Sequence, residues 1–190
     1  MIQVSKRLLC NSLLASLLSI ACGISPALAQ NYPNKTITLI APYAVGGDSD
    51  FSGRNLAAVA SKMIGQPVVV QNIVGASGTI GSQRVRTSPP DGYTLLVSRG
   101  GSQAITPALD SSTPYKWNDF TMISLLDFNP VVCVVKPDAP YKTMKDLIDA
   151  IRANPGKLNY ATAGPGTTQH LAVEVILSQL GLPSTAAMMI

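Results

Sequence analysis

The sequence predicts an α/β fold in which helices cover a largely parallel sheet. Apolar, strand-like runs alternate with helix-like runs along the chain, which is the pattern of such a sheet. Three of the strand-like runs lead into a helix through a glycine-rich turn, at Gly46-Gly47, Gly75–Gly81 and Gly164–Gly166. There is no internal repeat and no low-complexity segment, so we expect ordinary globular lobes.

The first half of the chain reads as three strands and two helices. The strand-like runs are rich in β-branched residues, and the first is apolar throughout, as a strand covered on both faces should be. The first helix has apolar residues at helical spacing and stops at Gly65-Gln66-Pro67. The predicted strands are 37–42, 68–72 and 93–98; the predicted helices are 50–64 and a second one that opens from the Gly75–Gly81 turn.

The second half is expected to begin with a crossover and to continue as a second α/β lobe. Residues 99–120 read as part binding loop and part crossover, because they are rich in small polar residues. Residues 121–137 predict two strands separated at Asn129-Pro130. Thr143 and Asp146 form a capping-box pattern that opens a helix. A further strand at 158–164 and a last helix at 170–180 follow.

The N-terminus carries the features of a secretory signal. Lys6 and Arg7 precede an apolar stretch, and Ala27-Leu28-Ala29 forms a small-x-small cleavage site before Gln30. The domain prediction is therefore a signal peptide at 1–29, a first lobe at 30–120 and a partial second lobe at 121–190. We expect export to the periplasm. Lipoprotein anchoring at Cys22 is the alternative.

Charge and cysteine content narrow the class of protein. Residues 1–29 hold two of the 14 basic residues and none of the 10 acidic ones, so the exported chain has a net charge of +2. This small net charge does not indicate a cluster of basic residues of the kind that binds nucleic acid, so we expect no nucleic-acid partner. Cys133 would remain as the single cysteine, inside the strand-like run PVVCVV, where we expect it to be buried.

The glycine-rich turns predict an anion site, yet the first one carries two acids. Unpaired amides and the helix dipole favour negative charge at a helix N-terminus, and glycine lets the backbone approach a ligand. Asp48 and Asp50 either stabilise the helix start or face the cleft and receive a ligand ammonium or hydroxyl group. The residues alone leave both roles open.

Catalysis has little support in the sequence. His170 is the only histidine, and it opens the last helix, where it either lines the cleft or fixes the turn. There is no nucleophile elbow of the G-x-S-x-G type, no P-loop and no metal-ligand spacing. We therefore predict that the protein is not an enzyme and that it uses no metal and no cofactor.

Several long motifs, in order, resemble one family. The runs YPNKTITLIAPYAVGGDSD, GQPVVVQNIVGASGTIG, PDGYTLL, KWNDF and YKTMKDLIDAIRANPGKLNYATAGPGTTQHLAVE are similar to those of the Bug family, the periplasmic solute-binding receptors of tripartite tricarboxylate transporters. The resemblance covers residues 31–182. It implies a periplasmic-binding-protein-like (Venus flytrap) fold and a small carboxylate ligand, such as a di- or tricarboxylate, an amino acid or an aromatic acid. It also implies membrane transporter subunits as partners, and we expect a monomer.

The resemblance also implies how the ligand is held. In the family, two glycine-rich turns hold a carboxylate through main-chain amides, and they match Pro42–Gly47 and Gly164–Thr167 here. The loops at Gly75–Gly78 and Arg99–Gln103 would complete the pocket. The candidate ligand-binding residues are Tyr43, Gly46, Gly47, Asp48, Asp50, Ala76, Ser77, Gly78, Ser102, Gln103, Ala163, Gly164, Gly166, Thr167, Thr168 and His170.

The chain departs from the family pattern in two respects. Asp48 stands where small neutral or hydroxyl residues are usual, so it either turns away from the carboxylate or meets a positive group of the ligand. Family members also continue for roughly another hundred residues beyond Gly181. We therefore expect a first lobe that is largely present and an incomplete second lobe. The alternatives to a receptor are a truncated, non-functional remnant of one and a sensor-type binding protein.

Overall fold

The computed structural model describes residues 32–190, so the predicted signal peptide lies outside the described residues. In this part of the chain, no helix is long and apolar enough to cross a membrane. The described residues form two separate parallel sheets with their helices. The division between the lobes at residues 120 and 121 stays a prediction.

The first sheet has three parallel strands in the order β2-β1-β3. Strand β1 (Ile37–Ala41) lies in the centre and is almost wholly buried, because strands flank it on both edges and helices cover its faces. Strand β2 (Val68–Asn72) pairs with it from Ile37↔Val68 to Ala41↔Asn72. Strand β3 (Thr94–Leu96) pairs on the other side and forms an edge of the described sheet.

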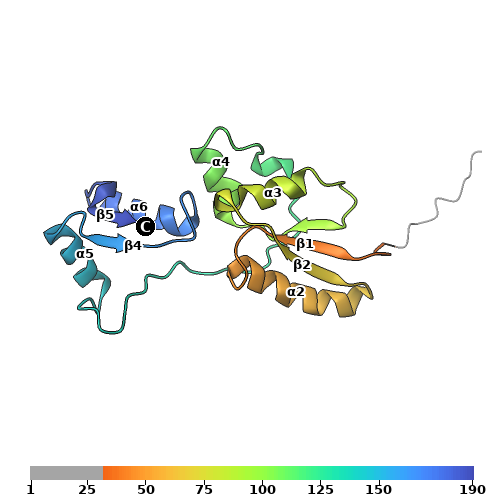
Figure 1. Cartoon of the computed structure of the whole chain (residues 1–190), viewed down its shortest axis with the longest axis horizontal. Coiled ribbons are helices and arrows are strands. Elements are labelled where there is room, and N and C mark those ends of the chain that lie inside the picture. The colour runs from red at the N-terminus through yellow and green to blue at the C-terminus, as the bar shows by residue number, and fades with distance from the viewer. Residues whose placement is uncertain (1–31) are drawn as a thin grey trace, which may run out of the picture. The chain divides into compact units, whose positions relative to one another are not determined.

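Two helices cover the first sheet on opposite faces (Figure 1). Helix α2 (Asp48–Ile64) packs on β1 and β2, and it ends at Gly65, which adopts a left-handed conformation with φ +68°. Helix α3 (Thr79–Arg86) packs on β1 and β3. The core between α2 and the sheet is built from Ile37, Leu39, Ala57 and Val97. Because strand ends and helix starts meet at one edge of a parallel sheet, the glycine turns gather there.

The segment after β3 is more helical than the sequence suggests. A single π-helical turn, Gly101–Ile105, runs directly into the short helix α4 (Thr106–Leu109). We predicted a binding loop here. The helical turn is stabilised by Tyr115, whose hydroxyl donates to the carbonyl of Ser102 at 2.6 Å. No local sequence pattern predicts such a contact.

The two strands predicted within residues 121–137 are absent from the described structure. The segment is an extended tube without helix or strand (Figure 1), and no sheet includes it. Its large apolar side chains are exposed, among them Leu125, Phe128 and Val134. Cys133, predicted to be buried, is exposed. The β-branched composition favours a strand, but a strand also needs a neighbouring strand for its backbone hydrogen bonds, and no described segment lies in that position.

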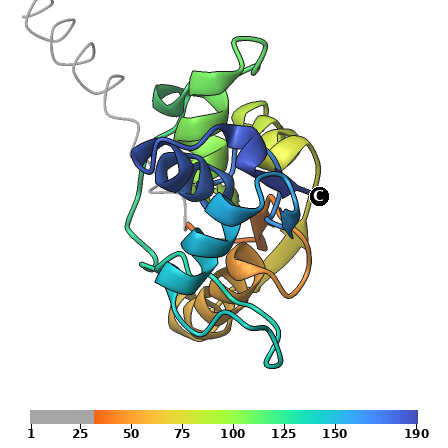
Figure 2. The same cartoon turned by 90° about the vertical axis from the view of Figure 1, so that its left-hand side faces the viewer.

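The second sheet has two parallel strands, β4 (Leu158–Tyr160) and β5 (Ala187–Met189). Helix α5 (Met144–Ala153) begins with the predicted capping box, in which Thr143 and Asp146 bond to each other's backbone. Helix α6 (Thr168–Gln179) follows β4, and Figure 2 shows this group of elements facing the viewer. Leu177, Ala186 and Ala187 form its small buried core. The sequence analysis did not predict β5, which is only three residues long.

Candidate ligand-binding turns

Hydrogen bonds within the chain hold the conformation of the first glycine turn, Gly46-Gly47. Gly46 adopts φ +77°, and its amide donates to Asp50 Oδ2 at 2.9 Å. Asp50 is buried and also pairs with Arg54, whose Nη2 lies 2.8 Å from Asp50 Oδ1. The hydrogen bonds from Arg54 and from the Gly46 amide lower the pKa of Asp50 to about 2. Asp50 is therefore ionised at neutral pH and holds the shape of the turn.

Helix α2 starts immediately after this turn without a side-chain cap. Its N-cap is Gly47, which has no side chain to accept from the amides of the first turn. These amides have no hydrogen-bond partner within the helix, as is the case for the first four N–H groups of any helix. Asp48 and Asp50 lie in the first turn, but Asp50 bonds to Gly46 and Arg54. The start of α2 therefore offers backbone donors to a ligand.

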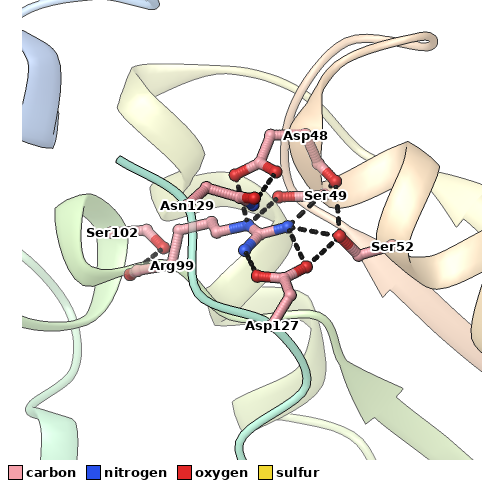
Figure 3. A network of polar contacts seen from close by, with 7 residues as sticks. All are labelled: Asp48, Ser49, Ser52, Arg99, Ser102, Asp127 and Asn129. Carbon is pink, nitrogen blue, oxygen red and sulfur yellow. Dashed lines mark hydrogen bonds and ion pairs between the residues drawn. The ribbon is translucent and has the colours of Figure 1, made fainter. Parts of the chain in front are cut away.

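Asp48 turns to Arg99 (Figure 3). Arg99 Nε lies 3.0 Å from Asp48 Oδ2, and Asn129 Nδ2 donates to Asp48 Oδ1 at 2.7 Å. Arg99 also pairs with Asp127 and donates to the Ser52 hydroxyl and the Asp48 carbonyl. The hydrogen bonds from Arg99 lower the pKa of Asp127. This Arg99 network thus supplies Asp48 with a positive partner from the protein itself.

Tyr43 lies among the glycine-rich segments of the first lobe. Its hydroxyl donates to the Ser77 carbonyl at 3.0 Å, and burial raises the pKa of the phenol. A Cβ at Gly78 would lie 3.1 Å from the Tyr43 ring and 2.9 Å from Ser102 Cβ. A Cβ at Gly101 would lie 3.2 Å from the Tyr43 hydroxyl. A side chain at Gly78 would force a neighbour to shift, and one at Gly101 would make tight contacts.

The loop before α3 has an unusual backbone. Gly75, Ala76, Ser77 and Gly78 all have positive φ, at +130°, +45°, +53° and +92°. Such angles are strained for the non-glycine residues, and strain of this kind concentrates at ligand-binding loops. The Ser77 hydroxyl donates to the Pro165 carbonyl in the second glycine turn, so the strained loop contacts the other candidate turn.

The second glycine turn leads from β4 to α6 and is fixed by Thr167 and His170. Thr167 is buried and caps α6, since its hydroxyl accepts from the His170 amide and donates to the Gly164 carbonyl. His170 Nδ1 accepts from the Gly166 amide at 3.2 Å. Its Nε2 lies 3.7 Å from Glu174 Oε1. His170 thus holds the turn, which is one of the two roles that the sequence left open.

The amide of Thr168, the first residue of α6, lies next to a glycine of the other lobe. A Cβ at Gly101 would be 3.4 Å from Thr168 N and 3.1 Å from Thr167 Cα. Gly101 therefore packs closely against the start of α6, where a side chain would press on the first turn of the helix. Thr106 donates to the Gly166 carbonyl at 3.5 Å on the same side. The candidate turns of the two sheets are thus in contact.

The remaining predicted residues differ in their placement. Ser102 and Gln103 are buried and hold the π-helical turn, through bonds to the Arg99 carbonyl and to the Ser82 hydroxyl. Ala76 and Ala163 are exposed at the two turns. Whether these candidates touch a ligand stays a prediction. Sequence analysis missed Asp127 and Asn129, although two polar residues within a long apolar run were a signal that they have partners.

The candidate turns have the features of an anion-binding site. Among residues 32–190, no group of three His, Cys, Asp or Glu side chains is placed to hold a metal ion. Backbone amides at two helix starts, glycines beside them and a half-buried tyrosine are features that two-lobe solute-binding proteins use to hold small anions.

Comparison with known proteins identifies the family. Residues 53–187 match the model of the tripartite tricarboxylate transporter family receptor, so the chain belongs to this family, as its motifs predicted. It is 35% identical to a UPF0065 protein of Bordetella pertussis over 173 residues, which are 90% of this chain and 54% of that protein. It is also 36% identical to the protein BugT of the same organism, over 83% of this chain and 49% of BugT. The chain thus spans about half the length of the curated relatives it matches.

Solved structures confirm the periplasmic-binding-protein-like fold. MatC (Rpa3494) from Rhodopseudomonas palustris, solved with bound malate, superimposes with a TM-score of 0.76 at 29% identity. The R. palustris protein Rpa4515, solved with adipate, gives a TM-score of 0.70 at 29% identity. Each match covers 84% of this chain and 53% of the other chain.

Proposed function

We propose that this protein is an extracytoplasmic solute-binding receptor that captures a small carboxylate for a tripartite tricarboxylate transporter. It acts in the periplasm as a monomer and passes its ligand to the membrane subunits of the transporter. Binding, and not turnover, is its activity. The ligand classes are di- and tricarboxylates, amino acids and aromatic acids.

The observation that supports this proposal best is the pair of helix starts that follow glycine-rich turns. Helix α2 begins at Gly47 without a side-chain cap, and Gly101 lets the backbone lie close to the first amide of α6. Each helix start carries a partial positive charge, so a carboxylate receives both directional hydrogen bonds and favourable electrostatics there.

Dicarboxylates fit the arrangement well, because two helix starts can hold two carboxylate groups. The relatives solved with malate and with adipate support this class of ligand. Asp48 has an internal partner in Arg99, so the structure gives no separate reason to require a positive group on the ligand.

A proline substitution tests the role of the backbone directly. Thr168 is the first residue of α6, a position that tolerates proline, and Thr167 before it has the extended backbone (φ −79°, ψ 164°) that proline requires. Thr168→Pro therefore removes one amide donor while leaving the helix intact. Thr168→Ala is the matched control, since it removes the hydroxyl and keeps the amide.

We expect Thr168→Pro to weaken binding of malate or adipate by about tenfold, the effect of losing one charge-assisted hydrogen bond of about 1.5 kcal/mol. Thr168→Ala should change the affinity little, and Met144→Pro, at the equivalent position of α5, should not change it. Isothermal titration calorimetry gives the affinities. Equal affinity in Thr168→Pro and the original chain would overturn the proposed role of α6.

A further inference from the structure

One side-chain hydrogen bond joins the strained loop Gly75–Gly78 to the second glycine turn. The Ser77 hydroxyl donates to the Pro165 carbonyl, which lies in the turn that leads into α6. A Cβ at Gly164 would lie 3.1 Å from Ser77 Oγ, so a side chain at that position would crowd the hydroxyl. Both partners of the bond belong to the chain itself. The bond therefore holds the loop and the turn together without help from a ligand.

Ser77 has a backbone conformation that glycine adopts more easily. Its φ and ψ are +53° and +35°, in the left-handed region, where a Cβ comes close to the following carbonyl oxygen. Gly75 and Gly78, on either side, have φ of +130° and +92°. A serine in this loop adds backbone strain, and strain of this kind persists where the surrounding structure holds it in place. The group that the serine adds is the hydroxyl that bonds to Pro165.

Tyr43 holds Ser77 from the side of the first glycine turn. Its hydroxyl donates to the Ser77 carbonyl at 3.0 Å. The backbone of Tyr43 is held in turn by Asn72, whose Nδ2 donates to the Tyr43 carbonyl at 3.0 Å. Ser77 thus accepts a hydrogen bond at its carbonyl and donates one at its hydroxyl. In this way it connects the segment Pro42–Gly47 with the second glycine turn.

The second glycine turn packs closely on the first lobe around this bond. Gly166 and Thr167 are buried, and a Cβ at Gly101 would lie 3.1 Å from Thr167 Cα. The Thr106 hydroxyl donates to the Gly166 carbonyl at 3.5 Å, which is long for a hydrogen bond. The bond from Ser77 is shorter, so it contributes more than the bond from Thr106.

We propose that Ser77, held by Tyr43, is a positioning residue that keeps the two candidate turns closed around the ligand and slows ligand exchange. The proposal deepens the proposed function and rests on it for the identity of the ligand. Exchange of a ligand between two lobes requires the lobes to separate, and separation breaks the bond between Ser77 and Pro165. Because the bond forms with or without a ligand, it slows entry and release together. A residue that only contacts the ligand changes release far more than entry.

The test compares Ser77→Ala with Ser88→Ala. Ser77→Ala removes the hydroxyl and keeps the Cβ, so the backbone strain stays. Ser88→Ala is the matched control, since Ser88 Oγ also donates to a backbone carbonyl, that of Arg84, at 2.8 Å after the end of α3. NMR line-shape analysis of a titration of the purified chain with malate gives the association and dissociation rates.

A second measurement follows the two lobes without a ligand. Spin labels replace Val59 on α2 and Lys145 on α5, both exposed, in a chain whose native cysteines are changed to serine. Electron–electron double resonance then gives the distribution of distances between the labels. The ratio of short to long distances reports how much of the chain is closed.

Ser77→Ala should raise the dissociation rate of malate about fivefold, the effect of losing one neutral hydrogen bond, and should raise the association rate as well. It should lower the ratio of closed to open chains by a similar factor, and Ser88→Ala should change none of these quantities. Tyr43→Phe should act in the same direction. The effect of the double variant should be smaller than the product of the two single effects, because both act through Ser77.

Ser77→Gly separates the proposed role from a contribution to folding alone. Glycine removes the hydroxyl and also relieves the strain at positive φ. Ser77→Gly should therefore speed ligand exchange as Ser77→Ala does, while its melting temperature stays at or above that of Ser77→Ala. Ligand exchange that is as slow in Ser77→Gly as in the original chain would contradict the role of the hydroxyl.

Two further results would overturn the proposal. The first is a Ser77→Ala chain with unchanged distances between the labels. The second is faster release with an unchanged association rate, because Ser77 would then act as a ligand contact. If neither malate nor adipate binds, the proposed function is contradicted instead, and the label distances still decide whether Ser77 holds the two turns together.

Discussion

Arg99 Nε lies 3.0 Å from Asp48 Oδ2, and this pair explains how an acid can stand at a turn that we propose binds an anion. The same guanidinium holds Asp127, so one arginine serves two carboxylates from segments far apart in the sequence. Asp50 is matched separately by Arg54. The acids of the first turn thus face arginines, and the backbone amides of α2 stay available for a ligand.

Removing Arg99 should destabilise the fold more than removing an exposed pair does. Arg99→Ala leaves Asp48 and Asp127 facing each other's charge in a partly buried site, at a cost of about 1–3 kcal/mol in the free energy of unfolding. Urea denaturation measures it. The control is Lys145→Ala, whose partner Asp149 is exposed and whose loss should change the free energy of unfolding much less, because solvent screens the pair. Equal effects of the two changes would contradict the assigned role of Arg99.

Neutralising Asp48 should strengthen carboxylate binding. Asp48→Asn keeps a polar side chain beside Asn129 and removes a negative charge from the first turn of α2. The expected gain in affinity for malate is about 2–5-fold, the size of an exposed charge interaction, and it should shrink in high salt. Calorimetric titrations at two salt concentrations measure both. A loss of affinity would show that Asp48 serves the site by holding Arg99.

Asp50 should make stability depend on acid pH. Its pKa in the folded chain is about 2, below the ordinary aspartate value of 3.8, so its contribution to stability is fully present above about pH 5 and is lost as the pH falls through 2. The urea midpoint of the original chain should therefore fall over this range. Other aspartates with lowered pKa also contribute to this fall. The informative quantity is therefore the difference in urea midpoint between the original chain and Asp50→Asn at each pH. A difference that is constant between pH 5 and pH 2 would contradict the assignment.

Gly78 should be far less tolerant of alanine than Gly65. Both have positive φ, at +92° and +68°, so both substitutions carry backbone strain of about 1 kcal/mol. At Gly78 the new Cβ would also lie 2.9 Å from Ser102 Cβ and 3.1 Å from the Tyr43 ring, while nothing lies within 4 Å at Gly65. We expect a clear fall in melting temperature only for Gly78→Ala. Similar melting temperatures for the two variants would show that the three segments do not pack as described.

The sequence predicted the elements whose signals are local. The strands of the first sheet appear within two residues of their predicted bounds, and Thr143 and Asp146 form the capping box. These features depend on neighbours along the chain. The glycine turn at Pro42–Gly47 was equally local, and its role in holding a ligand stays a prediction.

What could not be predicted depends on distant partners. Residues 121–137 have the composition of strands, yet they lack a neighbouring strand among the described residues. The orientation of Asp48 is set by Arg99 and Asn129, which lie 51 and 81 residues away in the chain. The π-helical turn depends on Tyr115. Composition and spacing carry no information about such pairs.

The most direct test of the carboxylate site is an NMR titration of the purified chain with malate, compared with its uncharged diamide. Amides at the start of α2, residues 47–50, and of α6, residues 167–169, should shift with saturation for malate and stay unchanged for the diamide. The exposed amides of α5 should stay unchanged with both. Equal shifts with malate and its diamide, or malate shifts confined to other regions, would contradict the account.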